Sequence, residues 1–260
     1  MQNIDPVFMV QPALVIMICA GLLLYWRRKR HFELTVFWYS LLAYAVAIAL
    51  KYVVQSIPIN ASLNDVELGV YYGFQTAVFE VGLAYLVAWY AVSHCKLERK
   101  DAEAYGAGLA FWENAVLLGT LPLIDLVAYY GILSSNTPLA QMVYDQLVKN
   151  AQAYFDPVPQ ALGLVAWGTL ERISSIMIHS AWGFLCFAGV YFHKKRLFLI
   201  ALPMGFIDFL VPFADRLGLA FFEIVIFAIG VLAVLVARYA TRSLESTASK
   251  EEKESTTSLL

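Results

Sequence analysis

The side chains in this sequence that could do chemistry lie inside long apolar stretches. A charged group at the centre of a bilayer costs about 2.5–3.5 kcal/mol on insertion scales, so each one needs a partner, a water-filled cavity or a bound ion. The candidates for a catalytic role are Glu113, Glu171 and His179. The candidates for a supporting polar core are Glu80, Arg172, Ser175 and Asp208.

Carboxylates and an imidazole support three kinds of chemistry. They can activate water by general-base catalysis, with Glu113 or Glu171 as the base; they can hold a divalent metal such as zinc; or they can relay protons. The candidate metal ligands are Glu113, His179 and Asp208. The sequence contains no GxSxG and no HExxH motif, which excludes the serine-hydrolase and zincin templates.

One predicted helix carries several of these residues on a single face. Glu171, Ser175 and His179 recur four residues apart, which is the spacing of one helix face. Glu171 and His179 are nevertheless about 12 Å apart along the axis at 1.5 Å per residue. An undistorted helix cannot bring both to one metal or one water, so each requires partners from other helices.

The elements that must position these residues are membrane-spanning helices. The chain is 60% hydrophobic and 15% charged, with a mean hydropathy of +0.66. About 20 apolar residues cross the hydrocarbon core, and stretches of that kind recur along the chain. The sequence predicts an all-α, polytopic transmembrane bundle of seven helices at residues 7–26, 34–54, 68–93, 106–130, 161–191, 197–213 and 218–240.

Basic residues indicate how the bundle is oriented. Lys and Arg gather at 27–30, 96–100, 194–196 and 238–253, and all four groups fall on one side if the N-terminus is outside. We therefore expect an external N-terminus and a cytoplasmic C-terminus in the cell membrane, with the lipid bilayer and no nucleic acid as partner. Residues 1–242 form the transmembrane domain, and the polar residues 243–260 form a disordered cytoplasmic tail.

Three local features predict a short helix, an interrupted span and a glycosylation site. Thr137 and Pro138 start a predicted short amphipathic helix in the longest external connection. Pro203 and Pro212 predict that the sixth span is broken or re-entrant. A glycosylation sequon begins at Asn60, although so short a pattern is frequent by chance.

Four short motifs carry a resemblance to a known family. They are Phe79-Glu80 followed by Tyr85, Tyr105-Gly106-Ala107-Gly108 followed by Glu113, Glu171-Arg172 followed by His179, and Gly205-Phe206-Ile207-Asp208. In order and spacing the chain resembles the YhfC-type family of intramembrane metalloproteases, which is grouped with PrsW and the CAAX prenyl endopeptidases. The resemblance implies peptide-bond hydrolysis within the membrane by water that carboxylates and histidine activate, with a membrane-embedded peptide as substrate.

The chain departs from the family pattern at four positions, as a divergent member would. Val81 and Ala84 stand where the family tends to carry Glu and Arg, and Leu109 and Met204 stand where it tends to carry His. The departures leave alternatives open: an intramembrane peptidase, an inactive relative that serves as a membrane scaffold or binding protein, and a proton- or ion-coupled transporter.

Overall fold

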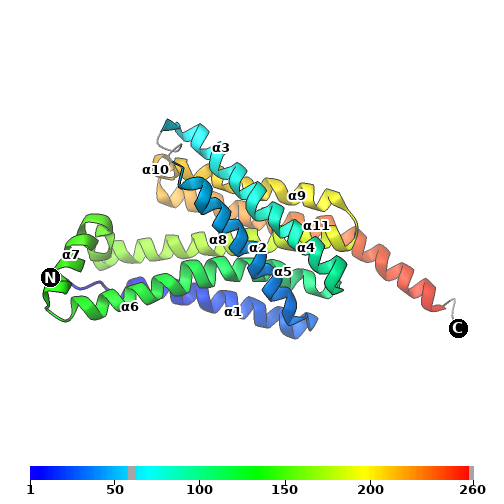
Figure 1. The fold of residues 1–260 in the computed structure, drawn as a ribbon, viewed down its shortest axis with the longest axis horizontal. Helices are drawn as coiled ribbons and strands as arrows, with labels where there is room; N and C mark the ends of the chain where they lie inside the picture. Colours follow the sequence, from blue (N-terminus) through cyan, green and yellow to red (C-terminus); the bar gives the residue numbers. More distant parts are fainter. Residues whose placement is uncertain (58–61, 258–260) are drawn as a thin grey trace.

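The computed structural model describes residues 1–57 and 62–257, and within these ranges every regular element is helical. Seven helical stretches in this part of the chain are long and apolar enough to cross a membrane, which confirms the predicted count. They are Pro6–Arg30, Leu34–Gln55, Asp65–Cys95, Arg99–Leu133, Val158–Tyr191, Lys195–Leu217 and Leu219–Arg242. The stretches lie roughly along one long axis of the molecule (Figure 1). The protein is thus a multi-pass helical bundle, and its orientation in the membrane stays a prediction.

Several of the seven stretches are divided into successive helical elements. Those that matter for the site are α1 (Val10–Arg30), α2 (Leu34–Gln55), α3 (Asp65–Gln75), η3 (Thr76–Val81), α4 (Gly82–Cys95), α5 (Ala102–Ala110), η5 (Phe111–Thr120), α6 (Leu121–Leu133), α8 (Val158–Tyr191), α9 (Lys195–Gly205), η7 (Phe206–Phe213), α10 (Ala214–Leu217) and α11 (Leu219–Thr257).

The centre of the bundle is α8. In its most apolar 18-residue window 72% of the residues are buried, against 39% or less in the other six spans. It packs against α4, α5, α9 and α11, and the ribbon runs through the middle of the bundle in Figure 1. Over most of the length of α8, a polar side chain therefore faces other protein segments. A buried charge there can find a partner on a neighbouring helix.

Small residues let neighbouring helices approach α8 closely. A Cβ atom added to Gly183 of α8 would lie 2.6 Å from the Cα atom of Gly106 of α5, so the two backbones are in contact there. Gly205 of α9 makes a similar approach to η3, where an added Cβ would lie 2.8 Å from the Cα atom of Ala77. Small residues at crossings are the usual way in which membrane helices gain close packing. These two crossings hold the segments that carry Glu113 and Glu80 near the core.

The three segments labelled η3, η5 and η7 are departures from α geometry. Both η3 and η5 are π-helical, and they carry Glu80 and Glu113 respectively. The segment η7 is a 3₁₀ helix that carries Asp208 and contains Pro212. The sixth span is therefore interrupted, as its prolines predict. Irregular helical turns of this kind recur at functional sites in proteins.

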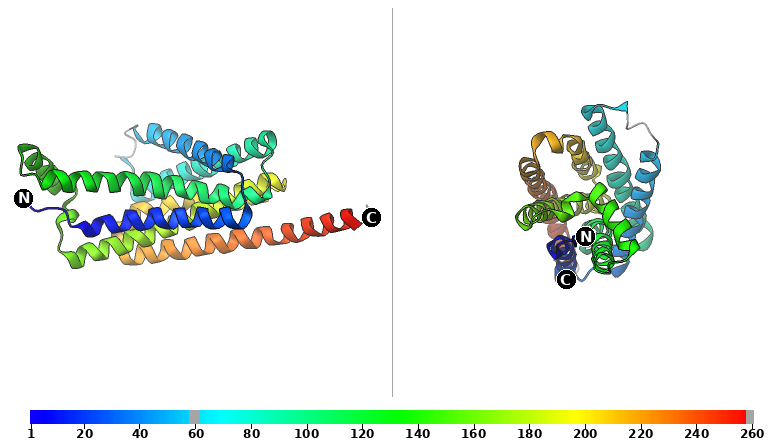
Figure 2. Two further views of the ribbon diagram at one scale, coloured as in Figure 1. Left: turned by 90° about the horizontal axis from the view of Figure 1, so that it is seen from below. Right: turned by 90° about the vertical axis from the view of Figure 1, so that its left-hand side faces the viewer.

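The predicted amphipathic helix is present as α7 (Pro138–Asn150), at the end of the bundle near the N-terminus (Figure 2). The Thr137 hydroxyl accepts a hydrogen bond from the Ala140 amide at 3.2 Å, which caps the first turn. Leu147 is buried on the inner face, whereas Leu139 and Met142 are more than half exposed.

Two sequence expectations concern residues at or beyond the limits of the described structure. The sequon at Asn60 lies outside the described residues. The helix α11 continues over 243–257, and 258–260 are not described. The expected disordered tail over 243–260 therefore stays a prediction.

The crossing of α5 and α8 generates a first prediction. Gly183→Ala places a methyl group against the backbone of α5, and overpacking of this kind typically costs about 1–3 kcal/mol. We expect a lower midpoint of thermal unfolding, measured in detergent by tryptophan fluorescence. Gly163→Ala on the same helix is the matched control, because an added Cβ there meets no atom within 4 Å. Equal midpoints for the two variants would show that the close crossing is absent in solution.

Candidate active site

Three ionisable side chains converge at the centre of the bundle. His179 comes from α8, Glu80 from η3 and Glu113 from η5, and one ligand atom of each lies within 4.8 Å of the other two. His179 Nε2 lies 3.2 Å from Glu80 Oε2 and is also in contact with Glu113 Oε2. The side chains are 8%, 8% and 16% exposed for His179, Glu80 and Glu113. We refer to these three residues as the triad.

The orientation of the His179 ring is set from its own helix. Nδ1 lies 2.9 Å from the carbonyl oxygen of Ser175 and 3.2 Å from its hydroxyl oxygen. A carbonyl oxygen only accepts hydrogen bonds, so this contact places the proton on Nδ1. The ring also packs on Trp182, with ring centroids 4.0 Å apart. Nε2 therefore faces the two carboxylates, as in metal sites where a backbone carbonyl fixes the tautomer of a liganding histidine.

A lysine from α2 neutralises one side of the triad. Lys51 Nζ lies 2.5 Å from Glu80 Oε1 and 3.3 Å from Asp208 Oδ2. It also donates to the Thr76 hydroxyl at 2.8 Å, and that hydroxyl donates to Asp208 at 2.5 Å. One oxygen of Glu80 thus contacts an ammonium group and the other contacts the imidazole.

An arginine from α8 lies on the opposite side of the triad. Arg172 Nη1 is 4.0 Å from Glu113 Oε1 and 3.5 Å from the side-chain oxygen of Asn114. Its other terminal nitrogen pairs with Glu171. Acidic and basic side chains alternate through the bundle in the order Asp208, Lys51, Glu80, His179, Glu113, Arg172 and Glu171.

The structure separates the predicted catalytic residues. Glu113 and His179 belong to the triad, with Ser175 beside the imidazole. Glu171 does not reach it: its side chain is 40% exposed and pairs with Arg172. This placement agrees with the axial separation of Glu171 and His179 along α8.

The predicted ligand set needs one correction. Asp208 was expected beside Glu113 and His179, but its carboxylate binds Lys51 and Thr76. Glu80, expected only as support, occupies the third position of the triad. The physical reason is that Lys51 stands between the two acids and contacts both of them. Metal binding by the remaining pair, Glu113 and His179, stays a prediction.

Sequence reasoning missed Lys51 and Thr76. Lys51 lies in the apolar stretch 34–54, and the cost of a charge at that depth applies to a lysine as it does to a carboxylate. That signal was present in the sequence. Thr76 carries no comparable signal, because a single hydroxyl is common in membrane helices.

The donor atoms of the triad fit a divalent metal. One imidazole nitrogen and two carboxylate oxygens are a usual set for catalytic zinc, which has three protein ligands and one open position. Tetrahedral bonds of about 2.0–2.2 Å require donors about 3.3–3.6 Å apart, and the His179–Glu80 separation of 3.2 Å is close to this. Glu113 Oε2 is buried and makes no hydrogen bond of acceptable geometry within the described structure. An ion would satisfy that oxygen.

The whole of this constellation falls inside a match to one family model. The model is described as YhfC intramembrane metalloprotease, and it matches residues 14–230. The chain belongs to the YhfC family. A search of curated proteins and a search of solved structures give no match.

The structure also shows what occupies two positions where the family resemblance implies histidine. Leu109 is buried in the main core one helical turn before Glu113, and its side chain lies beside Gly183, one turn after His179. Met204 packs against the same core. Both positions are therefore occupied by apolar side chains that pack in the core.

The Lys51–Glu80 pair generates a second prediction. Lys51→Met leaves a buried carboxylate without its cation, and removing one member of a buried ion pair typically costs about 3–5 kcal/mol. We expect a clearly lower unfolding midpoint in detergent, with partial recovery in Lys51→Met/Glu80→Gln because one of the two carboxylates that lose their cation is then neutral.

Lys149→Met is the control, since Lys149 is exposed on α7. A Lys51→Met midpoint no lower than that of Lys149→Met would contradict the pairing.

Proposed function

We propose that the protein hydrolyses peptide bonds of a membrane-embedded substrate at the triad. The observation that carries this proposal is the convergence of His179, Glu80 and Glu113 from three separate helical segments in the bundle core. Membership of the YhfC intramembrane metalloprotease family supports it. Bringing two carboxylates and an imidazole together in a membrane interior is energetically costly, which favours a use for the arrangement.

The depth of the triad supports a substrate that is itself in the membrane. His179 is 12 residues from Tyr191, where α8 ends, so it lies about 18 Å along the axis from that end. The other end of α8 is farther away. A soluble peptide would have to leave water to reach this level, whereas a peptide within the bilayer already has its backbone at the required depth.

The triad residues would hold a divalent ion such as zinc. When bound, the ion would lower the pKa of a coordinated water and polarise the substrate carbonyl. Ser175 holds His179 Nε2 toward the ion position, and Lys51 fixes one oxygen of Glu80 so that the other faces the imidazole.

Glu113 is the carboxylate best placed to accept a proton from water. The ion would take Oε2 of both Glu80 and Glu113. Lys51 occupies the remaining oxygen of Glu80, whereas Arg172 approaches the remaining oxygen of Glu113, Oε1, no closer than 4.0 Å. A general base needs a free oxygen within reach of the reacting water. Of the two bases that the sequence leaves open, the geometry favours Glu113, because Glu171 lies outside the triad and pairs with Arg172.

One observation favours a second candidate function, that of a scaffold. The alternating charges join different helices: Lys51 of α2 contacts Glu80 of η3, and Arg172 of α8 approaches Glu113 of η5. Interhelical pairs of this kind can fix a membrane bundle without any reaction. The two functions differ in whether the loss of one carboxylate changes activity or only stability.

Glu113→Gln tests the proposed function. The substitution preserves shape but removes the proton acceptor, and general-base catalysis contributes about 10²–10⁴-fold to rate. We expect cleavage of transmembrane peptides in proteoliposomes to fall by at least about a hundredfold. Glu33→Gln is the control, because Glu33 is exposed in a loop.

The metal content of the purified protein gives an independent readout. We expect one equivalent of divalent metal, measured by mass spectrometry of the elements, and loss of both metal and cleavage after chelation. Protein that holds no metal and leaves the peptides uncut, with Glu113→Gln lowering only the unfolding midpoint, would favour the scaffold. A larger loss of cleavage in Glu171→Gln than in Glu113→Gln would reverse the assignment of the base.

A further inference from the structure

A basic pocket lies at the end of the bundle where the Lys and Arg residues gather, and its floor includes Ser180, the residue that follows His179 in α8. Its volume is about 900 Å³, and it lies between α1 and α11 with α8 as its floor. In Figure 2 the C-terminal ends of α1 and α11 point toward the same end of the molecule. We define the basic pocket by its cations and one floor residue: Lys29, Arg30, Arg99, Arg238, Arg242 and Ser180.

Positive charge is in excess in this pocket. Its lining holds five cationic side chains and a single described carboxylate, Glu103, so the net charge is four positive. Glu103 pairs with Arg30 at 2.6 Å and with Arg99 at 2.8 Å. The described residues provide no carboxylate within ion-pair distance of Arg238 or Arg242. The pocket is therefore electrostatically suited to an anion.

The floor of the pocket is apolar with one unsatisfied hydroxyl. Ser180 Oγ is buried and has no hydrogen-bond partner among the described residues, and Phe184 lies one turn along the same helix. Val234 lines the pocket eight residues before Arg242, which is about 12 Å deeper along α11. A cationic rim above an apolar floor matches a ligand with a charged head and a hydrocarbon body.

Aromatic and aliphatic side chains at the mouth of the pocket also suit an amphiphile. Tyr25 and Trp26 line it from α1, and aromatic residues of this kind favour the headgroup level of a bilayer. Leu235 and Tyr239 of α11 are 58% and 83% exposed, so they present apolar surface to the surrounding lipid.

We propose that the basic pocket binds the phosphate-bearing headgroup of an anionic phospholipid. Lys29, Arg238 and Arg242 contact the phosphate, Ser180 donates to an ester or headgroup oxygen, and the acyl chains run along Leu235. Basic pockets between membrane helices on the cytoplasmic side are suited to anionic lipids, and this end of the bundle is the predicted cytoplasmic one. The proposal does not depend on peptidase activity.

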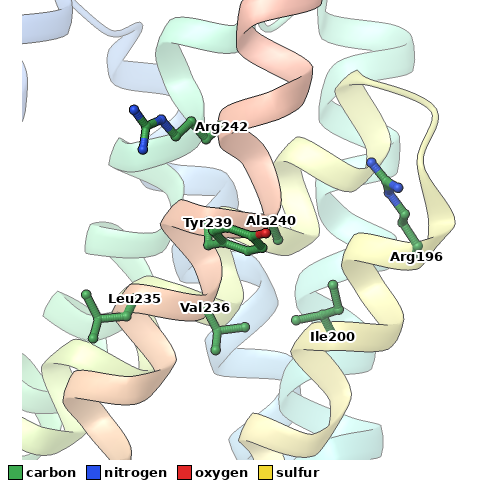
Figure 3. Close-up of a pocket in the computed structure, with 7 residues that line it drawn as sticks. All are labelled: Arg196, Ile200, Leu235, Val236, Tyr239, Ala240 and Arg242. Atoms are coloured by element: carbon green, nitrogen blue, oxygen red, sulfur yellow. The ribbon is translucent and has the colours of Figure 1, made fainter.

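A second hollow nearby lacks this convergence of charge. It lies between α9 and α11, has a volume of about 760 Å³ and contains Arg196 and Arg242. Figure 3 shows that the Arg242 guanidinium points away from Arg196, on the side of α11 that faces away from α9. The charges in this groove therefore cannot hold one phosphate together, whereas the basic pocket collects its cations around a single opening.

The test is lipid binding by the full chain in nanodiscs of phosphatidylcholine, titrated with phosphatidylglycerol and read out by native mass spectrometry. We expect saturable binding of phosphatidylglycerol, about thirtyfold weaker in Lys29→Gln/Arg238→Gln because each basic residue near a membrane surface contributes about fivefold. The matched control is Arg28→Gln/Lys195→Gln, which removes the same charge at the same end, outside the pocket.

Each outcome decides the proposal. Weaker binding in the pocket variant with unchanged binding in the control supports a built lipid site. An equal loss in both variants would show general attraction of a basic surface and would overturn it, as would no preference for phosphatidylglycerol over phosphatidylcholine. Inorganic phosphate that raises the unfolding midpoint in detergent as much as phosphatidylglycerol does would assign the site to a small soluble anion instead of a lipid.

Discussion

The cost of removing charge from water governs this structure. Seven acidic and basic side chains alternate through the core, and each acid in the series contacts a cation or the imidazole. Except for Glu171–Arg172 within α8, the contacts join different helical segments, so the bundle must close before these charges are satisfied. Three features bring the partners together: α8 is buried, its glycine crossing lets α5 approach closely, and α2 places Lys51 beside Glu80.

Two independent findings point to the same region of the chain: the sequence match to the YhfC family and the convergence of side chains in the core. The match covers residues 14–230, which includes every helix that contributes to the triad. Leu109 and Met204, two positions where the resemblance implies histidine, pack in the apolar core of the bundle.

Much of the fold could be predicted from the sequence because a bilayer imposes simple rules. The lengths of the apolar stretches predicted the seven spans, and the pair Thr137 and Pro138 predicted the start of α7. The partners of the buried charges could not be predicted in the same way. Helical spacing shows that Glu171 and His179 are too far apart, but it does not show that Glu80 and not Asp208 stands beside His179, since that depends on crossing angles and on the place of Lys51.

The π-helical turns at Glu80 and Glu113 have a consequence for how the core is assembled. A π turn closes its hydrogen bond one residue later than an α turn does, so returning η5 to α geometry would rotate the helix after η5 by about 100° relative to the helix before it and would turn Glu113 part of the way round. Its carboxylate would then face another neighbour. The triad is thus set by hydrogen-bond register within a helix, and a change of register would dismantle it while every span kept its place in the bilayer.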